Sequence, residues 1–356
     1  MTRTVRGILI FFLVLMSILS GCTKQPKEKA KTPGRLKWKA DTVAVGFKPL
    51  GWLSYSPVVA NGVVYLRGRD GLYALDAKTG KQKWMLKNKF SIATPCVSDG
   101  VLYMGSLDGI FAINAKTGKG IWYFKIGHEV DSKPTVADGT VYFGCADSKF
   151  YAVSAKSGRI KWVRATKKPV YSTPAVAEGV VYFGGTDNYL YALDAKTGTR
   201  KWVFRTGGIV GSPIVEGGTL YFGSWDNHIY ALNTKTGKRR WKAALDSEIT
   251  SAPAIDNGTI YCASWNGNVY ALDLKTGIKK WVFKREMLSG LDASPVIDAG
   301  TVYIGIDKFY ALGARTGKKK WDFQVIKGSQ SPGISSAVVS GKTIYFISNG
   351  VYAVRQ

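Results

Sequence analysis

The 356-residue sequence is poor in the side chains that build metal centres and covalent cross-links. It contains two histidines, His128 and His228, and four cysteines. Two histidines without partners at ligand spacing argue against a histidine-based zinc site. Three of the cysteines, Cys96, Cys145 and Cys262, stand at unrelated places, and an odd number argues against a disulfide framework or a metal cluster. We expect these three to be buried, small apolar residues.

Long apolar runs are confined to the beginning of the sequence. Arg3 and Arg6 precede an apolar run over residues 8–16, and small residues follow it. A charged start, a short apolar core and a small-residue end predict a signal peptide over residues 1–21 rather than a membrane span. The protein is therefore expected to be exported, which makes nucleic acid a poor partner.

The end of this signal peptide, Leu19-Ser20-Gly21-Cys22, resembles a bacterial lipobox. The resemblance implies cleavage before Cys22 and a lipid on its thiol, diacylglycerol with acyl chains such as palmitate. The alternative is an ordinary cleavable signal that happens to end near a cysteine. Several acyl chains would anchor the protein durably, because each buried methylene contributes about 0.8 kcal/mol.

Residues 22–34 have almost nothing to bury, so they predict a flexible, basic tether that follows the lipid. Position 23 is Thr23, not the Asp that retains lipoproteins at the inner membrane of some Gram-negative bacteria. We therefore expect an exported protein that is lipid-anchored to a bacterial envelope membrane, the outer membrane if the cell is Gram-negative.

The rest of the chain, residues 35–356, consists of one repeated unit. A Thr-Gly pair, Ser-Gly in one copy, is followed by a Trp four residues after the Gly, at intervals of 38 to 40 residues. Each copy contains four short strands separated by turn residues, and the Trp stands on the last strand, where it can seal one copy against the next. The tryptophans of this blade motif are Trp38, Trp84, Trp122, Trp162, Trp202, Trp241, Trp281 and Trp321.

A proline, Pro174 in the fourth copy, recurs on the first strand, which must be an edge because proline cannot donate to an interior ladder. Seven full copies leave three strands at the C-terminus without a Trp, and the segment around Trp38 supplies the missing fourth. We predict an all-β fold, an eight-bladed β-propeller of four-stranded blades whose last blade is closed by the N-terminal strand. An open solenoid would need polar capping repeats, which the sequence lacks.

The segment over residues 74–84, with the pattern Ala-x-Asp-x-x-Thr-Gly-x-x-x-Trp, resembles the repeats of the pyrroloquinoline-quinone (PQQ) repeat superfamily. The resemblance covers nearly the whole chain after the signal peptide. Four copies depart at the Asp position, where Asn114, Ser154, Asn233 and Gly313 stand, and Gly313 cannot cap the turn. The matching motif is a structural turn, so by itself it does not indicate a cofactor.

Two branches of that superfamily are relevant, quinoprotein dehydrogenases and BamB-like lipoproteins of outer-membrane β-barrel assembly. The dehydrogenases use PQQ and calcium, with an adjacent disulfide-bonded cysteine pair, acidic and amide calcium ligands and an aspartate base. No adjacent cysteine pair exists here, and length and the lipobox favour the lipoproteins. The resemblance thus implies a non-enzymatic scaffold without cofactor or metal, a monomer within a complex of envelope proteins. A small PQQ- and calcium-dependent dehydrogenase is the alternative, and a polyanion- or glycan-binding propeller is another.

Residues that vary between copies are the candidate ligand-binding positions. Three residues before the proline position stand Asp131, Tyr171 and, four blades from Asp131, Asp292. The two aspartates should face each other across the ring, either around a bound cation or, because the channel is wide, as solvated carboxylates.

Loops after the second strands form a second candidate partner face. They hold Trp225 with Asp226, Trp265 with Asn266, and Arg67 with Arg69. The two tryptophans form either an exposed platform for a peptide or a sugar, or packing between loops.

Charge is the third feature, because Lys and Arg number 50 and Asp and Glu 24, a formal net charge of +26. Many basic residues lie in the Thr-Gly turns and predict a basic collar on one face of the ring. Acidic residues on the first hairpins should lie nearer the axis of that face. They are Asp99, Asp138, Glu178, Glu216, Asp256 and Asp298. The collar would bind anionic lipid or wall polymer, or it is a solvated rim.

Overall fold

The computed structural model describes residues 35–40, 56–68, 71–87, 93–285, 293–325, 334–348 and 350–356. The chain separates into two compact units, Met1–Lys31 and Thr32–Gln356, and all described residues belong to the second unit. The described residues form strands and turns but no helix, so none of them builds an apolar helix that could cross a membrane.

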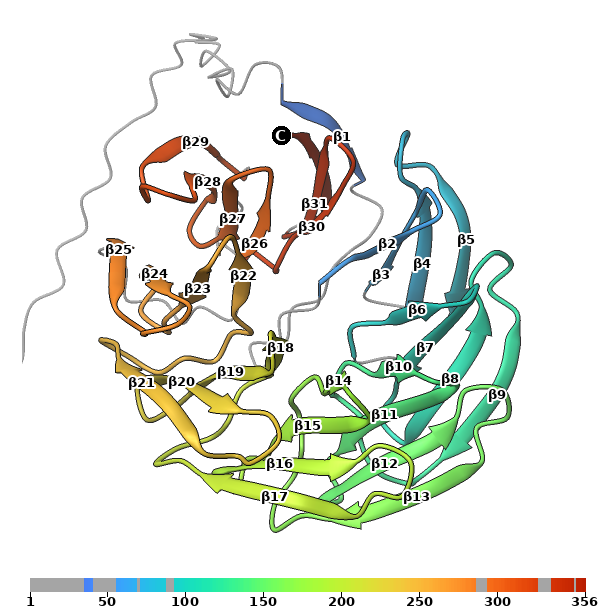
Figure 1. Ribbon diagram of the computed structural model, residues 1–356. Helices are drawn as coiled ribbons and strands as arrows, with labels where there is room; N and C mark the ends of the chain where they lie inside the picture. The colour runs from blue at the N-terminus through green and yellow to red at the C-terminus, as the bar shows by residue number, and fades with distance from the viewer. Residues whose placement is uncertain are drawn as a thin grey trace, which may run out of the picture. The chain divides into compact units, whose positions relative to one another are not determined.

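The strands of the second unit form eight four-stranded antiparallel sheets arranged as the blades of a ring (Figure 1). Blade one contains β2 (Val58–Ala60), β3 (Val63–Arg67), β4 (Gly71–Asp76) and β5 (Gln82–Lys87), and blade two contains β6 (Cys96–Ser98), β7 (Val101–Gly105), β8 (Gly109–Asn114) and β9 (Gly120–Lys125). Blade three contains β10 (Thr135–Ala137), β11 (Thr140–Cys145), β12 (Lys149–Ser154) and β13 (Ile160–Ala165). Blade four contains β14 (Ala175–Ala177), β15 (Val180–Gly184), β16 (Tyr189–Asp194) and β17 (Arg200–Arg205).

Blade five contains β18 (Ile214–Glu216), β19 (Thr219–Ser224), β20 (His228–Asn233) and β21 (Arg239–Ala244). Blade six contains β22 (Ala254–Asp256), β23 (Thr259–Ala263), β24 (Val269–Asp273) and β25 (Lys279–Phe283). Blade seven contains β26 (Val296–Asp298), β27 (Thr301–Gly305), β28 (Phe309–Gly313) and β29 (Lys319–Phe323). Blade eight combines the two chain ends: β1 (Leu36–Ala40), β30 (Val338–Ser340), β31 (Thr343–Ile347) and β32 (Val351–Arg355). The predicted fold class, an eight-bladed propeller, is therefore confirmed.

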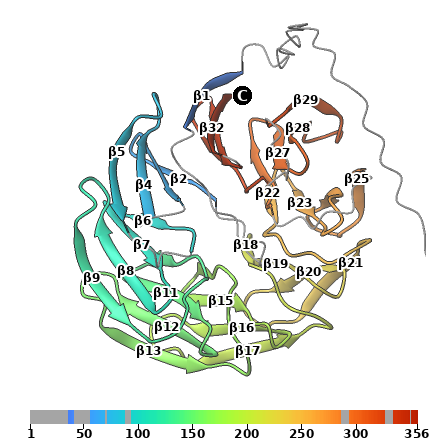
Figure 2. The same cartoon turned by 180° about the vertical axis from the view of Figure 1, so that it is seen from behind.

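The seam of the ring lies in blade eight, where the N-terminal strand pairs with the last strand of the chain. Trp38 lies opposite Ala353 and Ala40 opposite Val351 in the antiparallel β1–β32 ladder. Figures 1 and 2 show β1 beside the C-terminal strands from both sides. The seam leaves this blade with the same four strands as the others, so the predicted closure around Trp38 is also confirmed.

Seven of the eight blade tryptophans bind the next blade through a hydrogen bond. The indole N–H of Trp162 on β13 donates to the carbonyl oxygen of Ala195 in the next blade, at 3.0 Å. The indole ring also covers Gly198 of that blade so closely that a Cβ there would lie 2.6 Å from the ring atom Cδ2. Gly198 has a φ of +69°, so glycine suits this turn in both conformation and size. Six other tryptophans donate to the next blade in the same way: Trp38, Trp84, Trp122, Trp202, Trp241 and Trp281.

The turn before each tryptophan is capped by the residue at the Asp position. The Asp194 carboxylate accepts from the N–H groups of Lys196 and Thr197 at 3.1 and 2.9 Å. The backbone hydrogen bond from Thr197 is the largest of the effects that lower the pKa of Asp194. Asn114 makes the equivalent bonds, whereas at Gly313 only the backbone oxygen accepts, from the N–H groups of Thr316 and Gly317.

Two of the three cysteines expected in the core lie there. Cys145 and Cys262 are fully buried, and burial raises the pKa of each thiol to about 12. Cys96 on β6 is only partly buried, and all three are free thiols. Neither buried thiol is a nucleophile at neutral pH, because the thiolate is the reactive form.

Candidate functional site

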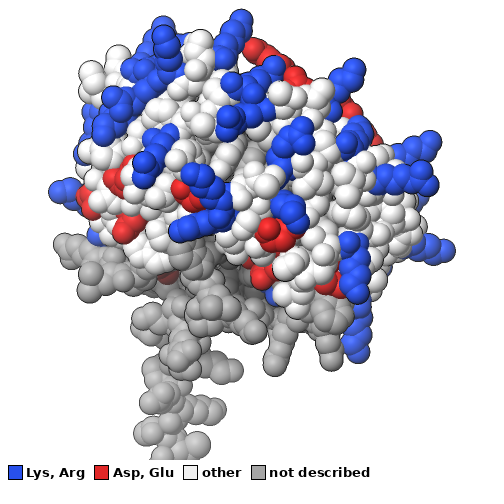
Figure 3. Space-filling model, turned by 90° about the horizontal axis from the view of Figure 1, so that it is seen from below, with Lys and Arg blue, Asp and Glu red and all other residues white. Residues whose placement is uncertain are grey.

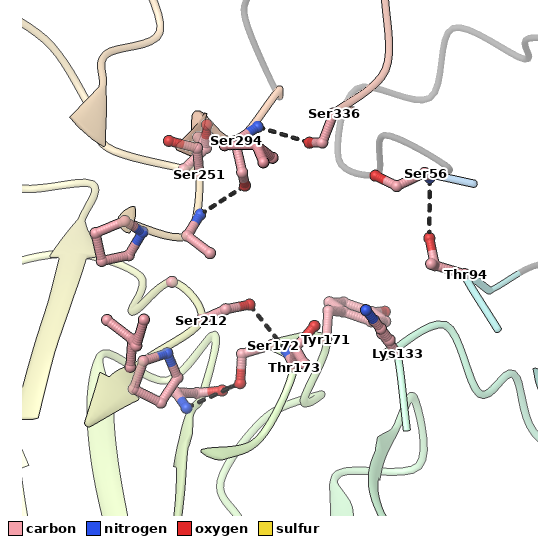
Figure 4. A pocket seen from close by; sticks show the side chains of 18 of the residues that line it. Ser56, Thr94, Lys133, Tyr171, Ser172, Thr173, Ser212, Ser251, Ser294 and Ser336 are labelled. Carbon is pink, nitrogen blue, oxygen red and sulfur yellow. Dashed lines mark hydrogen bonds between the residues drawn. The ribbon is translucent and has the colours of Figure 1, made fainter. Parts of the chain in front are cut away.

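The first strands of the blades surround a central cavity of about 520 Å³ (Figure 4). The residue immediately before each proline faces this cavity, and in most blades it carries a hydroxyl group. Those residues are Ser56, Thr94, Thr173, Ser212, Ser294 and, at the equivalent place in blade eight, Ser336. Lys133 and Ala252 occupy the same position in blades three and six.

These hydroxyl groups join neighbouring blades around the cavity. The Thr173 N–H donates to the Ser212 hydroxyl at 2.9 Å, and the Ser294 N–H donates to the Ser336 hydroxyl at 2.6 Å. Similar bonds run from the Ser56 and Ala252 backbones to the next blade, and Figure 4 draws all of these bonds as dashed lines. Four of these hydroxyl oxygens thus accept a bond that joins two blades: those of Thr94, Ser212, Ser294 and Ser336.

In blades three and four a second serine fastens the first strand to its own blade. The Ser172 hydroxyl donates to the carbonyl of Gly184 at 2.8 Å and accepts from the Gly184 N–H at 2.9 Å. Ser132 makes the same reciprocal pair with Gly144. Each of these hydroxyls both donates and accepts a hydrogen bond within its blade, so these two serines are not candidates for nucleophilic chemistry.

The carboxyl and the ammonium group in the cavity wall both come from blade three, as Asp131 and Lys133, and Tyr171 of blade four also lines the cavity. Asp131 is only 7% exposed. Burial, followed by the negative charge of Glu129, raises the pKa of the Asp131 carboxyl to about 8. The expectation of a solvated carboxylate is therefore wrong for Asp131: it is buried, and its Oδ1 atom makes no hydrogen bond within the described protein.

The predicted pairing of Asp131 with Asp292 across the ring stays a prediction, because Asp292 lies outside the described residues. What the structure brings to Asp131 instead is the positive charge of Arg67, from the end of β3, which opposes the rise in the pKa of the carboxyl. Arg69, the second arginine of that loop, also lies outside the described residues. Glu129 and Lys133 were not recognised as candidates, although Lys133 is the one large side chain before a recurring proline.

Trp225 also lines the cavity, and its surroundings are those of a packed loop. Its N–H donates to the carbonyl of Ile209 at 2.9 Å, and a Cβ on Gly208 would lie 3.0 Å from the Trp225 Cβ. The side chain is half-buried. Trp225 is therefore held by packing while part of it borders the cavity.

Asp226 braces its loop. Its carboxylate accepts from the Tyr230 hydroxyl at 2.6 Å, from the Gly207 N–H at 2.8 Å and from the His228 N–H at 3.2 Å. Asp187 accepts from the Tyr191 hydroxyl in the preceding blade at the same distance, 2.6 Å. The aspartate is thus a recurring structural group of these loops.

Trp265 and Asn266 are not brought together with Trp225 around the cavity. Both are half-buried, the Trp265 N–H donates to the carbonyl of Glu248 at 2.8 Å, and the Asn266 amide oxygen accepts from the Ser264 hydroxyl at 2.6 Å. Neither residue lines the central cavity. The backbone contacts of both loops are those of packed turns, and an exposed platform for a peptide or a sugar stays a prediction.

The two faces of the ring have the predicted arrangement. The Ala195 N–H donates to the carbonyl of Gly179 at 2.9 Å, which places the first hairpin of a blade beside its Thr-Gly turn. The Thr166 N–H donates to the carbonyl of Ser148 at 2.8 Å and so joins the other two connections on the opposite face. Figure 3 shows basic side chains over one side of the molecule and along its upper border, with fewer acidic ones among them.

The described residues do not supply the donor set that the dehydrogenase branch uses for its quinone and calcium. The cysteines at 96, 145 and 262 lie in three different blades, on β6, β11 and β23, so none of them forms an adjacent pair. The described part of the chain contains no group of three or more His, Cys, Asp or Glu side chains that could hold a metal ion. Hydroxyl-bearing residues, valines and prolines make up most of the cavity wall.

Comparison with solved structures shows the same fold in several proteins. BamB from Moraxella catarrhalis superimposes with a TM-score of 0.73 at 20% identity, covering 84% of this chain and 95% of that chain. The computationally designed Ika8 protein gives 0.76 at 14% identity, covering 91% and 100%. The quinohemoprotein alcohol dehydrogenase ADHIIG from Pseudomonas putida HK5 gives 0.70 at 15% identity, covering 86% and 75%. At these identities the likeness shows the fold alone.

Comparison of sequences identifies the family. No curated protein sequence matches the chain. The family model described as outer membrane protein assembly factor BamB, a PQQ-repeat family, matches residues 29–125, 107–212 and 204–356. Because these three segments together span nearly all of the eight blades, the chain belongs to the BamB family of PQQ-repeat β-propellers.

Proposed function

We propose that the protein is a non-enzymatic lipoprotein that serves as a protein-binding scaffold in outer-membrane protein assembly, as a monomer within a complex. The observation that carries the proposal is the match to the BamB family model across all the blades. The cavity wall supports a scaffold, because four of its serine and threonine hydroxyls are used in bonds between neighbouring blades. The lipobox at Cys22 supports a location at an envelope membrane, the outer membrane in a Gram-negative cell.

The partner is tested by capture from the envelope. The full chain, with its lipid and a C-terminal affinity tag, is expressed in its own host and purified in mild detergent, and co-purifying proteins are identified by mass spectrometry. Recovery of β-barrel assembly components is the expected result. A clean preparation without any of them would contradict the assembly role.

The anchor is tested separately with Cys22→Ala. We expect wild-type protein to sediment with membranes and to carry a lipid-modified N-terminal peptide, and Cys22→Ala to lose the lipid. Unmodified Cys22 in the mature wild-type protein would contradict the lipoprotein assignment and leave the scaffold role standing.

The two alternative functions have readouts of their own. Addition of PQQ and calcium to the purified protein should leave it without quinone absorbance and without dye reduction by alcohols or aldose sugars. Binding to glycan and polyanion arrays should be weak and should fall steeply with salt, because exposed charges are screened. Glycan binding that persists in high salt, or dye reduction by the protein with PQQ and calcium, would contradict the proposed function.

A further inference from the structure

Blade two differs from the other blades at the residue before the tryptophan on its outermost strand. In seven blades that residue is basic: Lys37, Lys83, Lys161, Lys201, Arg240, Lys280 and Lys320. In blade two it is Ile121, on β9, and 48% of its surface is exposed. Outer strands of a propeller are free sheet edges, and a lysine on such an edge discourages pairing with another strand. Blade two has no lysine at this position in the middle of the edge.

In some of the other blades the basic residue is bound to a threonine at the start of the second strand of its own blade. Lys161 donates to the Thr140 hydroxyl at 2.6 Å, and Lys280 donates to the Thr259 hydroxyl at 2.9 Å. In blade two, Val101 replaces the threonine and Ile121 the lysine. A cavity of about 570 Å³ lies beside β9, lined by Leu86, Phe111, Ile121 and Tyr123 among others.

The surface around β9 is apolar in its middle and basic at its ends. Tyr123 is 51% exposed and Leu107 is 46% exposed, close to the value for Ile121. Lys116, Lys119 and Lys125 are exposed on either side of this apolar patch. The nearest acidic group, Asp108, accepts from the Ser106 hydroxyl at 3.0 Å, and a hydrogen bond from Tyr123 lowers its pKa.

We propose that β9 (Gly120–Lys125) is a docking edge, to which an extended segment of a partner protein adds as a fifth strand of blade two. The segment places apolar side chains on Ile121 and Tyr123 and carries acidic residues at its ends, opposite the lysines. Main-chain hydrogen bonds supply affinity in such a complex, and alternate side chains supply specificity. The proposal rests on the proposed function, since it names the surface and the kind of partner that a protein-binding scaffold would use.

Charge decides between a partner and a second copy of this chain. The chain has a net charge of +26, and pairing of two β9 strands would bring Lys119 and Lys125 of one copy onto those of the other. Like charges directly opposite on paired strands are destabilising. An acidic segment of another protein meets no such repulsion, so it is the occupant that the edge favours.

The test uses full-length protein and a fluorescein-labelled peptide, acetyl-Asp-Glu-Val-Thr-Val-Thr-Val-Glu-Asp-amide. Fluorescence anisotropy should show salt-dependent binding, and hydrogen exchange should show protection of the backbone amides of residues 120–125. Ile121→Lys should raise Kd by about tenfold, as expected for loss of an interface anchor. This variant is expected to fold, because seven blades already carry a basic residue there. Val203→Lys, at a 38% exposed site on β17, is the matched control and should leave Kd unchanged.

Two modified peptides separate strand addition from other modes of binding. A peptide that is N-methylated along one edge keeps its side chains but loses main-chain donors, and it should not bind. A peptide with lysine in place of its acidic residues should bind weakly. The proposal is overturned by equal binding of the N-methylated peptide, by equal binding to Ile121→Lys, by no binding at all, or by Ile121-dependent self-association in sedimentation. None of these results affects envelope capture by the wild-type protein, so failure of this edge and failure of the scaffold function are distinguishable.

Discussion

The indole N–H of Trp38 on the N-terminal strand donates to the carbonyl oxygen of Ala77 in blade one, at 3.0 Å. The same ring packs on Gly80, where a Cβ would lie 2.6 Å from it, and lies 6.0 Å from the ring of Tyr345. Trp38 thus fastens blade eight to blade one from a strand that belongs to the other end of the chain. The two ends of the protein and the first blade are joined through one side chain.

Replacement of Trp38 should weaken the closure of the ring. We expect Trp38→Ala to lower the free energy of unfolding by about 3 kcal/mol, because a large ring is removed from a packed boundary. Trp38→Phe should cost about 1–2 kcal/mol, since it keeps most of the ring and loses the hydrogen bond. Urea unfolding followed by tryptophan fluorescence measures both changes. Equal stability of Trp38→Ala and wild type would show that β1 contributes nothing to closure.

Two glycines of blade four separate backbone conformation from packing. Gly198 and Gly179 both have positive φ, +69° and +71°. A Cβ at Gly198 would meet the Trp162 ring, whereas a Cβ at Gly179 would meet nothing within 4 Å. We expect Gly179→Ala to cost about 1 kcal/mol from conformation alone and Gly198→Ala about 2–4 kcal/mol. Thermal unfolding of the two variants checks this order, and a larger loss for Gly179→Ala would refute it.

Ala299 has an unfavourable backbone conformation, with a φ of +45° in the hairpin between β26 and β27. The equivalent hairpin between β22 and β23 has Asn257 with the same φ, and asparagine tolerates this region. Ala299→Asn should therefore stabilise the protein by about 0.5–1 kcal/mol, and the reciprocal change Asn257→Ala should destabilise it by a similar amount. Calorimetry that finds both changes of the same sign would contradict this explanation.

Burial of Asp131 should make stability depend on pH. Its carboxyl has a pKa of about 8 in the folded protein against an ordinary value of 3.8. The folded state therefore keeps a proton that the unfolded chain releases, and the free energy of unfolding should fall as the pH rises from 3.8 to about 8. The stabilisation is complete below this range and lost above it.

Asp131→Asn tests this directly, since asparagine resembles the protonated carboxyl in shape and cannot titrate. The variant should show a shallower loss of stability across that range and should be more stable than wild type at the upper end. Parallel pH profiles of the two proteins, measured by urea unfolding, would contradict the assignment of the slope to Asp131.

The fold was predictable because its determinants are local and repeated. Each Thr-Gly turn requires a glycine at positive φ beneath a tryptophan, and each proline marks an edge strand, so the number of copies gives the number of blades. Trp38 revealed the seam because it stands where the C-terminal copy lacks its tryptophan.

The candidate site was less predictable, because burial there depends on contacts between blades. Nothing near Asp131 in the sequence shows that Arg67 from blade one acts on it or that neighbouring blades exclude water. The repeat pattern also did not indicate that Asp226 has a structural role, because its hydrogen bond with Tyr230 depends on the three-dimensional fold. The signal at Ile121 was present in the alignment of the copies, but its meaning required knowledge that β9 is an outer edge.

The pairing of β1 with β32 means that the ring cannot be completed during synthesis. The first strand to be made waits for the last, and every shorter product keeps an open blade with unpaired edges. The entropy lost on closing a loop grows only slowly with loop length, so the long separation of β1 and β32 in the sequence costs little. The main disadvantage is the time for which β1 remains unpaired during synthesis. A chain that lacks β1 or β32 should therefore expose unpaired strand edges in blade eight and be cleaved faster by a protease than the closed ring.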